Sequence, residues 1–393
     1  MKKNKHDRKY IIFGGDGINP LGIVRSLGEV GIESDIIRFR ESAHLATIET
    51  CKYVRNAYYG DTSEELLTIL LSHYGDEELK PVVFFTDEGN EAFFDAHYNK
   101  LKDKFICYNA DIENGINNLL SKEVQCQLAA QCGIRVPIYE VLDKSVLPSK
   151  VPYPVITKTL TSNDGGWKKD MIICNNEEEL KVAYSKIQAK KIMVEEYING
   201  TNEVDLKGFS INGGEQIYFT SLKKWHYKDV QHKWLMYFEP CYNEDLKRKL
   251  SSLIRKANYS GIFDAEFMQD INGELFFLEV NWRTGMYNYN HTYEGVNLPF
   301  LWAKSMIDNN IDSNSIHQCE ESYSAIDEIN SFADVLRHPK LLIKWIKAIR
   351  KADILFYYNK QDKKPCIIAW KRFLMRKVAK FFNGKNNKRL TSA

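Results

Sequence analysis

The chain has 393 residues, of which 44% are hydrophobic and 27% charged, as in an ordinary globular protein with room for two or three domains. No stretch approaches the ~18 apolar residues of a membrane span, so the composition excludes an integral membrane protein built from such helices. The net charge of +2 conceals an asymmetry, because residues 331–393 hold 17 basic and 3 acidic residues, a net of +14, against −12 in the remainder.

The eight cysteines are scattered, with no C-x-x-C pair and no histidine at zinc-site spacing. This distribution is typical of free, buried thiols in a reducing compartment. The N-terminal residues are charged and lead into a short strand rather than an apolar leader. We therefore expect a cytoplasmic protein.

The first part of the chain alternates strands with helices. Strands are predicted over 9–13, 32–39 and 81–86, and a helix over about 21–30 follows a glycine-containing turn at 14–17. Such alternation is typical of a parallel α/β domain.

The predicted pattern of secondary structure changes after a helix over 124–132. From Pro154 onward, short apolar strands are separated by turns such as Asn212-Gly213 and Asn272-Gly273, with two helices over about 176–188 and 243–258. The predicted strands are ITKTL, MIIC, IMVEEYI, VDLKGFS, QIYFTSL, FDAEFMQ and LFFLEV. This order predicts an antiparallel α+β region, distinct from the first domain.

The segment 261–283 reads as a hairpin that carries acidic residues on apolar strands. Glu266 lies on its first strand, and Glu279 and Asn281, two residues apart, point to one face of its second. Two carboxylates and an amide oxygen are the hard ligands that Mg²⁺ prefers. The alternative is that these side chains simply face solvent.

Two upstream segments favour the metal-site interpretation. Lys158 ends a strand before the polar, glycine-rich connection 162–166, whose backbone N–H groups can fold over phosphates while the lysine supplies a charge. The strand 192–198 ends in polar residues that could form a hinge reading an adenine edge, followed by acids suited to ribose hydroxyls.

The order of these parts resembles the ATP-grasp superfamily. The resemblance covers about residues 115–305. It rests on the following residues in chain order: Lys122, Lys158 with its glycine-rich turn, Glu195-Glu196-Tyr197-Ile198 with Gly200 and Glu203, Glu266, and the E-x-N-x-R run 279–283. It implies an ATP-grasp fold of mixed α/β and α+β class with an N-terminal Rossmann-like, pre-ATP-grasp domain over 1–117. The ATP-grasp domain would span 118–310, with a nucleotide-clamping part at about 140–200 and a metal-binding part at about 201–310. A basic amphipathic helical region would follow over 311–393.

The resemblance also implies roles for individual residues. Lys122 and Lys158 would hold the ATP phosphates under the loop of Gly165 and Gly166, and Glu195, Tyr197 and Ile198 would line the adenine hinge. Glu203 would bind the ribose, with Asp205 as the alternative. Glu266, Glu279 and Asn281 would bind one or two Mg²⁺ ions, for which Mn²⁺ could substitute. Arg283, with Lys158, would be catalytic by stabilising the transferring phosphoryl group.

The implied activity is an ATP- and Mg²⁺-dependent ligase that activates a carboxylate as an acyl-phosphate and joins it to an amine. The turn-helix segment 14–29 and the basic tail also look like the D-aspartate ligase and carboxylate–amine ligase branch associated with bacterial surface polysaccharides. The substrates would then be small molecules or glycan or peptidoglycan precursors. Thr159 and Trp282 stand where the family commonly has proline, which leaves the branch open. Another ATP-grasp reaction, carboxylase-like or phosphotransfer, and a non-catalytic nucleotide-binding protein at the membrane are the alternatives.

Several further residues are candidates for the substrate side. Arg25 could bind a substrate carboxylate or lie on the surface, and the segment 223–227 could line the acceptor site or be an exposed loop. Glu88 and Asn90 follow the strand 81–86, where open α/β sheets bind ligands. The polar-aromatic run 285–290 could contact the activated carboxylate.

The tail contains two basic amphipathic patterns, at 338–351 and 366–382, rich in tryptophan, phenylalanine and isoleucine. Such helices are typical of proteins that bind an anionic membrane surface, here through residues 331–393. Their apolar faces could instead pack on the enzyme body. Nucleic acid is a less favoured partner, because no recognisable nucleic-acid fold accompanies the charge. A homodimer is left open.

Overall fold

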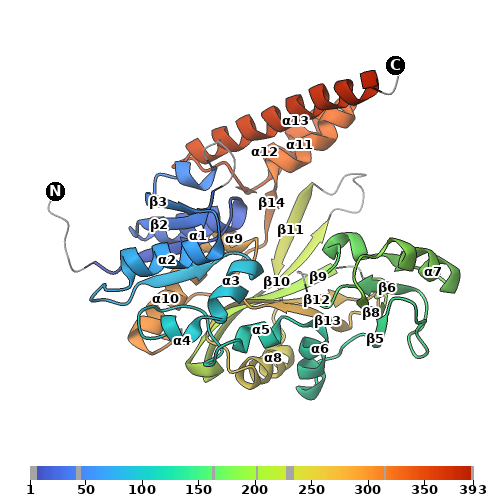
Figure 1. Ribbon diagram of the computed structural model, residues 1–393, viewed down its shortest axis with the longest axis horizontal. Helices are drawn as coiled ribbons and strands as arrows, with labels where there is room; N and C mark the ends of the chain where they lie inside the picture. The colour runs from blue at the N-terminus through green and yellow to red at the C-terminus, as the bar shows by residue number, and fades with distance from the viewer. Residues whose placement is uncertain are drawn as a thin grey trace.

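Three sheets organise the chain in the computed structural model, which describes residues 7–40, 46–161, 164–200, 202–226, 234–313 and 316–390 (Figure 1). The first is a parallel sheet in the order β3 (Val54–Gly60), β2 (Ser34–Phe39), β1 (Tyr10–Phe13) and β4 (Val82–Phe85). Its helices are α1 (Ile18–Glu29), α2 (Ser63–Tyr74), α3 (Glu88–Asp95), α4 (Tyr98–Leu101) and α5 (Gly115–Leu119).

The strand β3 is not among the predicted strands, and its position explains why. It lies at the edge of the sheet and carries Arg55 and Asn56, which hydrogen-bond to Asp35 on β2. An edge strand that presents polar side chains lacks the apolar run by which buried parallel strands are predicted.

The second sheet is small and antiparallel. Its order is β5 (Tyr139–Asp143), β8 (Lys191–Glu196), β6 (Val155–Lys158) and β7 (Ile173–Cys174), with α7 (Glu177–Lys186) beside it and α6 (Lys122–Gln131) before it. Val155, Leu180, Ile192 and Val194 form a core of their own, separate from the main core. Figure 1 shows this sheet and α7 on the right of the molecule, away from the first sheet.

The third sheet has seven strands and contains the hairpin predicted over 261–283. Its order is β13 (Leu275–Asn281), β12 (Gly261–Gln269), β9 (Asn202–Ile211), β10 (Gln216–His226), β11 (Leu235–Pro240), β14 (Tyr323–Ile326) and β15 (Ile354–Leu355). All neighbours are antiparallel except β14 and β15. The helices α8 (Glu244–Lys256), α9 (Asn288–Tyr293) and α10 (Leu298–Asp308) accompany it. Its apolar side shares one continuous core with the first sheet.

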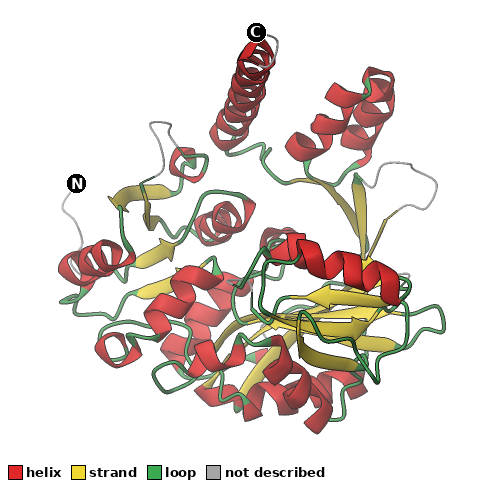
Figure 2. Cartoon of the chain, turned by 45° about the vertical axis from the view of Figure 1, so that its right-hand side comes forward, coloured by secondary structure: helices red, strands yellow, loops and turns green. Residues whose placement is uncertain are grey.

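The basic C-terminal region contributes both strands and helices. Besides β14 and β15, it forms α11 (Glu328–Arg337), α12 (Leu342–Lys351) and α13 (Lys364–Leu390). Figure 2 shows these helices above the sheets. Trp345 and Ile349 of α12 are partly buried against Trp234, Ile326 and Val335, so part of the predicted apolar face packs on the protein. The side chains of Phe381 and Phe382 lie outside the described residues.

A buried ion pair joins this C-terminal region to the first domain. Arg25 on α1 donates from Nε to Asp362 Oδ2 at 3.1 Å and from Nη2 to the Tyr357 carbonyl at 2.8 Å, and Asp362 Oδ1 accepts from the Lys52 N–H. The two charged side chains are only 1% and 2% exposed. Both interpretations of Arg25, as a substrate ligand and as a surface residue, are therefore wrong, because its guanidinium is used within the fold.

All eight cysteines are free, as predicted, and six of them are buried. Within the described part of the chain, no helix is long and apolar enough to cross a membrane.

Candidate active site

The hairpin β12–β13 brings the three expected metal ligands together. Glu266 and Glu279 are direct cross-strand partners, so their side chains share one face of the sheet. Asn281, two residues beyond Glu279, donates from Nδ2 to Glu266 Oε1 at 3.0 Å. The hairpin register thus places two carboxylates and an amide within one hydrogen-bonded cluster.

This cluster forms one wall of a cavity of about 380 Å³, a volume typical of small-molecule sites. The cavity is lined by residues from the first domain, from the small sheet and from the hairpin. Six of the residues predicted to bind phosphate or metal or to stabilise the transferring phosphoryl group line it: Lys122, Lys158, Glu266, Glu279, Asn281 and Arg283. Segments more than 150 residues apart therefore meet at one place.

Two lysines enter this cavity from different elements. Lys122 begins α6 and forms an ion pair with Glu279. Lys158 is the last residue of β6 and is buried, and its Nζ lies 2.6 Å from Glu195 Oε1 on β8. Burial lowers the pKa of Lys122, and the charge of Lys158 lowers it further. Two cations held close together in this way are poised for a polyanion such as a triphosphate.

The glycine-rich connection is fixed at its base by Asp170. The Gly166 N–H donates to Asp170 Oδ2 at 2.9 Å, and the Gln188 and Ala189 N–H groups donate to the same carboxylate. Although burial raises the pKa of Asp170, these three donors hold it below its ordinary value. Gly165 has φ +54°, and a Cβ there would lie 2.5 Å from the Ala189 nitrogen, so glycine is required. Neither glycine lines the cavity, and Ser162 and Asn163 lie outside the described residues.

The predicted adenine hinge follows β8. The Tyr197 N–H donates to the Pro154 carbonyl at 2.9 Å, and the Glu196 N–H donates to the Ile138 carbonyl at 2.8 Å. The Ile198 carbonyl accepts from the Gly200 N–H at 2.8 Å, so a nucleotide base would have to use other backbone groups of this segment, such as the Ile198 N–H. The buried carboxylate of Glu195 faces Lys158. The roles of these hinge residues stay predictions.

The two candidates for ribose binding lie two residues apart on β9 but in different surroundings. Glu203 is partly exposed and pairs with Lys224 on the neighbouring strand β10. Asp205 is buried, and its Oδ2 lies 3.8 Å from Lys207 Nζ. Accessibility favours Glu203 over Asp205.

The grouping of buried charged residues on β12 of the hairpin and on its neighbour β9 was not predicted. Asp205 and Lys207 on β9 lie beside Asp264 and Glu266 on β12, and Lys207 forms an ion pair with Asp264. Burial, with the charges of Asp264 and Asp205, raises the pKa of Glu266 to about 7. The alternation of charged residues, Asp-x-Lys on one strand and Asp-x-Glu on the next, is the sequence signal that could have revealed the cluster.

Arg283 joins the hairpin to the first domain. Its Nη2 donates to Glu88 Oε1 at 3.0 Å and to Asn281 Oδ1 at 3.2 Å. Glu88 begins α3 and lines the cavity, as its position after a parallel strand predicts. The nearby Glu91 is fully buried, and burial raises its pKa well above the ordinary value, with Arg283 opposing that shift. Asn90 has a structural contact, since its N–H and Nδ2 both donate to Asp87, the N-cap of α3.

The remaining substrate-side candidates fall into two groups. Gly285 and Met286 line the cavity. Asn288 is instead buried, and its Nδ2 donates to Asn19 Oδ1 at 2.9 Å, which holds the start of α1 against this segment. Lys223 pairs with Glu239 at 3.2 Å on the strand β11. Of the same segment, Tyr227 and the side chains of Trp225 and His226 lie outside the described residues.

The donor set fits Mg²⁺ shared with a nucleotide. Among the described residues there is no group of three His, Cys, Asp or Glu side chains arranged to hold a metal by itself. Two carboxylates and an amide supply only part of a six-oxygen shell, and Mg²⁺ ordinarily completes its shell with water and substrate phosphates. Lys122 and Lys158 in the same cavity are suited to bind those phosphates.

No family model matches the chain. It is 32% identical over 162 residues to a D-alanine–D-alanine ligase of Campylobacter concisus, a match that covers 37% of this chain and 42% of the relative. It is 24% identical over 131 residues to an N5-carboxyaminoimidazole ribonucleotide synthase of Staphylococcus epidermidis, over 33% and 34% of the two chains. Each match therefore covers less than half of the length of the curated relative.

Solved structures match over most of the length. The N5-carboxyaminoimidazole synthetase of Staphylococcus aureus complexed with ADP has a TM-score of 0.64 at 17% identity, and 87% of each chain is covered. The L-amino acid ligase of Bacillus licheniformis has a TM-score of 0.61 at 14% identity, over 81% of this chain and 79% of that one. These neighbours confirm the predicted architecture. The chain has the ATP-grasp fold.

Proposed function

We propose that the protein is an ATP- and Mg²⁺-dependent ligase that activates a carboxylate as an acyl-phosphate and joins it to an amine. The observation that carries this proposal is the single cavity where Lys122, Lys158, Arg283 and the Glu266–Glu279–Asn281 cluster meet. The cavity therefore contains both cations that can bind a triphosphate and oxygen ligands that can bind its metal ion. The names of two relatives, a D-alanine–D-alanine ligase and an L-amino acid ligase, agree with this reaction class.

The proposed chemistry needs no protein nucleophile. A carboxylate is a poor electrophile because oxide would have to leave. Transfer of the γ-phosphoryl group to it makes phosphate the leaving group, and the amine then displaces phosphate to form the amide. Catalysis would consist of positioning and charge neutralisation.

Each residue has a defined part in this proposal. Lys122 and Lys158 bind phosphate oxygens, and Arg283 stabilises charge on the phosphoryl group as it is transferred. Glu266, Glu279 and Asn281 would hold Mg²⁺, which supplies Lewis-acid neutralisation of the phosphates. Lys122 pairs with Glu279 and Lys158 with Glu195, so each lysine that would bind phosphate also has a carboxylate beside it.

The proposal predicts that ADP and phosphate are released only when ATP, Mg²⁺, a carboxylate and an amine are all present. The measurement is a phosphate-release assay over a panel of amino acids, amino sugars and dipeptides, with each component omitted in turn. Hydroxylamine should trap the acyl-phosphate as a hydroxamate. Release that requires bicarbonate as the activated carboxylate would instead support a carboxylase-like reaction, and phosphate transfer to a hydroxyl would support a kinase-like one.

We propose further that the C-terminal region contacts an anionic membrane surface, where a surface-polysaccharide or peptidoglycan precursor would be available as substrate. Ile343 on α12 and Ile367 and Leu374 on α13 are exposed large apolar residues on basic helices. Exposed apolar side chains interleaved with lysine and arginine are typical of helices that lie in a membrane interface. We expect the full chain to sediment with anionic vesicles and not with neutral ones, and equal behaviour with both would exclude this contact.

A further inference from the structure

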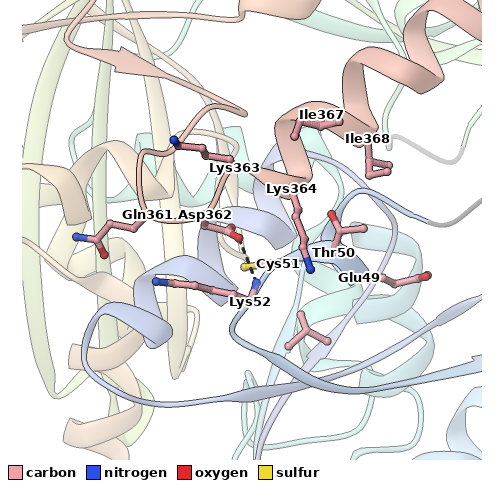
Figure 3. Close-up of a pocket in the computed structure, with 11 residues that line it drawn as sticks. Glu49, Thr50, Cys51, Lys52, Gln361, Asp362, Lys363, Lys364, Ile367 and Ile368 are labelled. Carbon is pink, nitrogen blue, oxygen red and sulfur yellow. Dashed lines mark hydrogen bonds between the residues drawn. The ribbon is translucent and has the colours of Figure 1, made fainter.

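A second cavity lies far along the chain from the catalytic residues. It has a volume of about 590 Å³ and is formed by the turn before β3 and by the start of α13 (Figure 3). Its lining from the first domain includes Glu49, Thr50 and Lys52, and its lining from the C-terminal region includes Lys363 and Lys364. None of the residues that line the catalytic cavity lines this one.

The charge of this cavity is positive because its acids are already neutralised. Glu49 pairs with Arg38 at 2.5 Å, and Asp362 pairs with Arg25 at 3.1 Å. By contrast, the three lining lysines, Lys52, Lys363 and Lys364, form no ion pair with another described residue. Figure 3 shows Lys364 extending from α13 toward Thr50 and Cys51. Lys52 Nζ lies over the Tyr53 ring, 4.6 Å from its centroid. The cavity is therefore lined by three lysines without an acidic partner among the described residues, and its volume is large enough for a phosphoryl group and part of its carrier.

One side of the cavity is apolar and continues outward along α13. Ile367 and Ile368 line it, and Ile367 is 62% exposed. Leu374 and Val378, seven and eleven residues later, are 49% and 55% exposed. This spacing places the three side chains within about 40° of one line along the helix. An apolar stripe thus runs from the cavity along the helix, with Lys371, Arg376 and Lys377 exposed on the same helix.

We infer that this cavity binds the phosphomonoester headgroup of an anionic lipid while the stripe Ile367–Leu374–Val378 rests on the bilayer. Charge complementarity favours a phosphate dianion over a zwitterionic headgroup, because three lysines line the cavity and each of its two acids is already paired with an arginine. The adjacent stripe favours a phosphate carried on an apolar chain over one carried on a soluble metabolite. The inference rests on the proposed membrane contact of the C-terminal region and adds to it a specific headgroup site.

The test compares vesicle binding by the full-length protein and two triple variants. One variant is Lys52→Ala/Lys363→Ala/Lys364→Ala. The matched control, Lys150→Ala/Lys190→Ala/Lys191→Ala, removes the same charge from exposed lysines outside the cavity. Co-sedimentation is measured with phosphatidylcholine vesicles that contain phosphatidic acid or phosphatidylserine, matched for surface charge. Melting temperatures verify that both variants are folded.

We expect the cavity variant to lose at least about tenfold of its affinity for phosphatidic acid vesicles, whereas the control stays within about twofold of the wild type. Wild-type protein should also prefer phosphatidic acid to phosphatidylserine, and the cavity variant should not. Equal losses in the two variants would overturn the headgroup site while leaving general membrane contact intact. Failure of the wild type to bind any anionic vesicle would overturn both proposals, whereas the amine-dependent phosphate release tests the catalytic proposal separately. The last measurement is the melting temperature in the presence of inorganic phosphate. A rise in melting temperature without binding to vesicles would overturn the assignment of the site to a lipid.

Discussion

Replacement of Glu279 by glutamine is expected to lower ATP turnover by a factor on the order of 10²–10³, the range observed when one charge-stabilising group is removed from an active site. Glu279 is both the cross-strand partner of Glu266 and the ion-pair partner of Lys122. The substitution keeps the size of the side chain but removes the anion, so the proposed Mg²⁺ site loses a charged ligand. Phosphate release with the true substrates is the measurement, and a raised Mg²⁺ requirement should accompany the loss.

Glu274→Gln is the matched control for this experiment. Glu274 belongs to the same hairpin but lies in its turn, where it forms an exposed ion pair with Arg135 at 3.1 Å. An exposed pair of this kind contributes about 0–1 kcal/mol to stability and has no place in the cavity. Near-normal turnover of Glu279→Gln, or an equal loss in Glu274→Gln, would remove the metal site from the proposed mechanism.

Replacement of Arg25 by methionine is expected to destabilise the protein by about 3–5 kcal/mol, because it leaves the buried Asp362 carboxylate without its cation. Methionine retains much of the apolar length of arginine, so lost packing contributes little. The guanidinium also donates to the Phe356 and Tyr357 carbonyls, and these acceptors lose their donor as well. Denaturation by urea, followed by tryptophan fluorescence, measures the change.

A second arginine provides the comparison. Arg40 pairs with Asp61 at 3.1 Å, the same separation as in the Arg25–Asp362 pair, but these two side chains are 61% and 62% exposed. Arg40→Met should therefore change stability by less than about 1 kcal/mol. The double variant Arg25→Met/Asp362→Asn should recover part of the loss, because it removes the buried charge. Similar effects of Arg25→Met and Arg40→Met would show that burial of the pair contributes nothing.

Arg25 also shows where prediction from the sequence stops. Its partner Asp362 is 337 residues away, and the two meet only because the C-terminal region returns to the first domain. The strands β14 and β15 were missed for the same reason. They are four and two residues long, so neither carries a clear hydrophobic pattern. β14 is held by hydrogen bonds to β11, and β14 and β15 are hydrogen-bonded to each other. Local periodicity carries no signal for such short, long-range pairings.

The hairpin is the opposite case. Its alternation, its Asn272-Gly273 turn and the two-residue spacing of Glu279 and Asn281 fix strand, turn and face locally, and the structure has both strands there as β12 and β13. The helices α7 and α8 also occur where the sequence predicts them, within two residues at each end. Their starts follow from Asn176 and Asn243, whose side chains accept from backbone N–H groups at the first turn.

By itself, therefore, the sequence determined the order along the chain of the residues proposed to bind phosphate, adenine and metal, because each of these motifs is a local arrangement of strand, turn and polar side chain. Only the tertiary structure decided that Lys122, Lys158 and Arg283 line one cavity with Glu266 and Glu279, since those residues come from one helix and two separate sheets. It also decided that Glu203 is accessible while Asp205 is buried with Lys207, and that Glu88 faces Arg283. Burial and charge pairing depend on which distant segments pack together, and no local pattern records that.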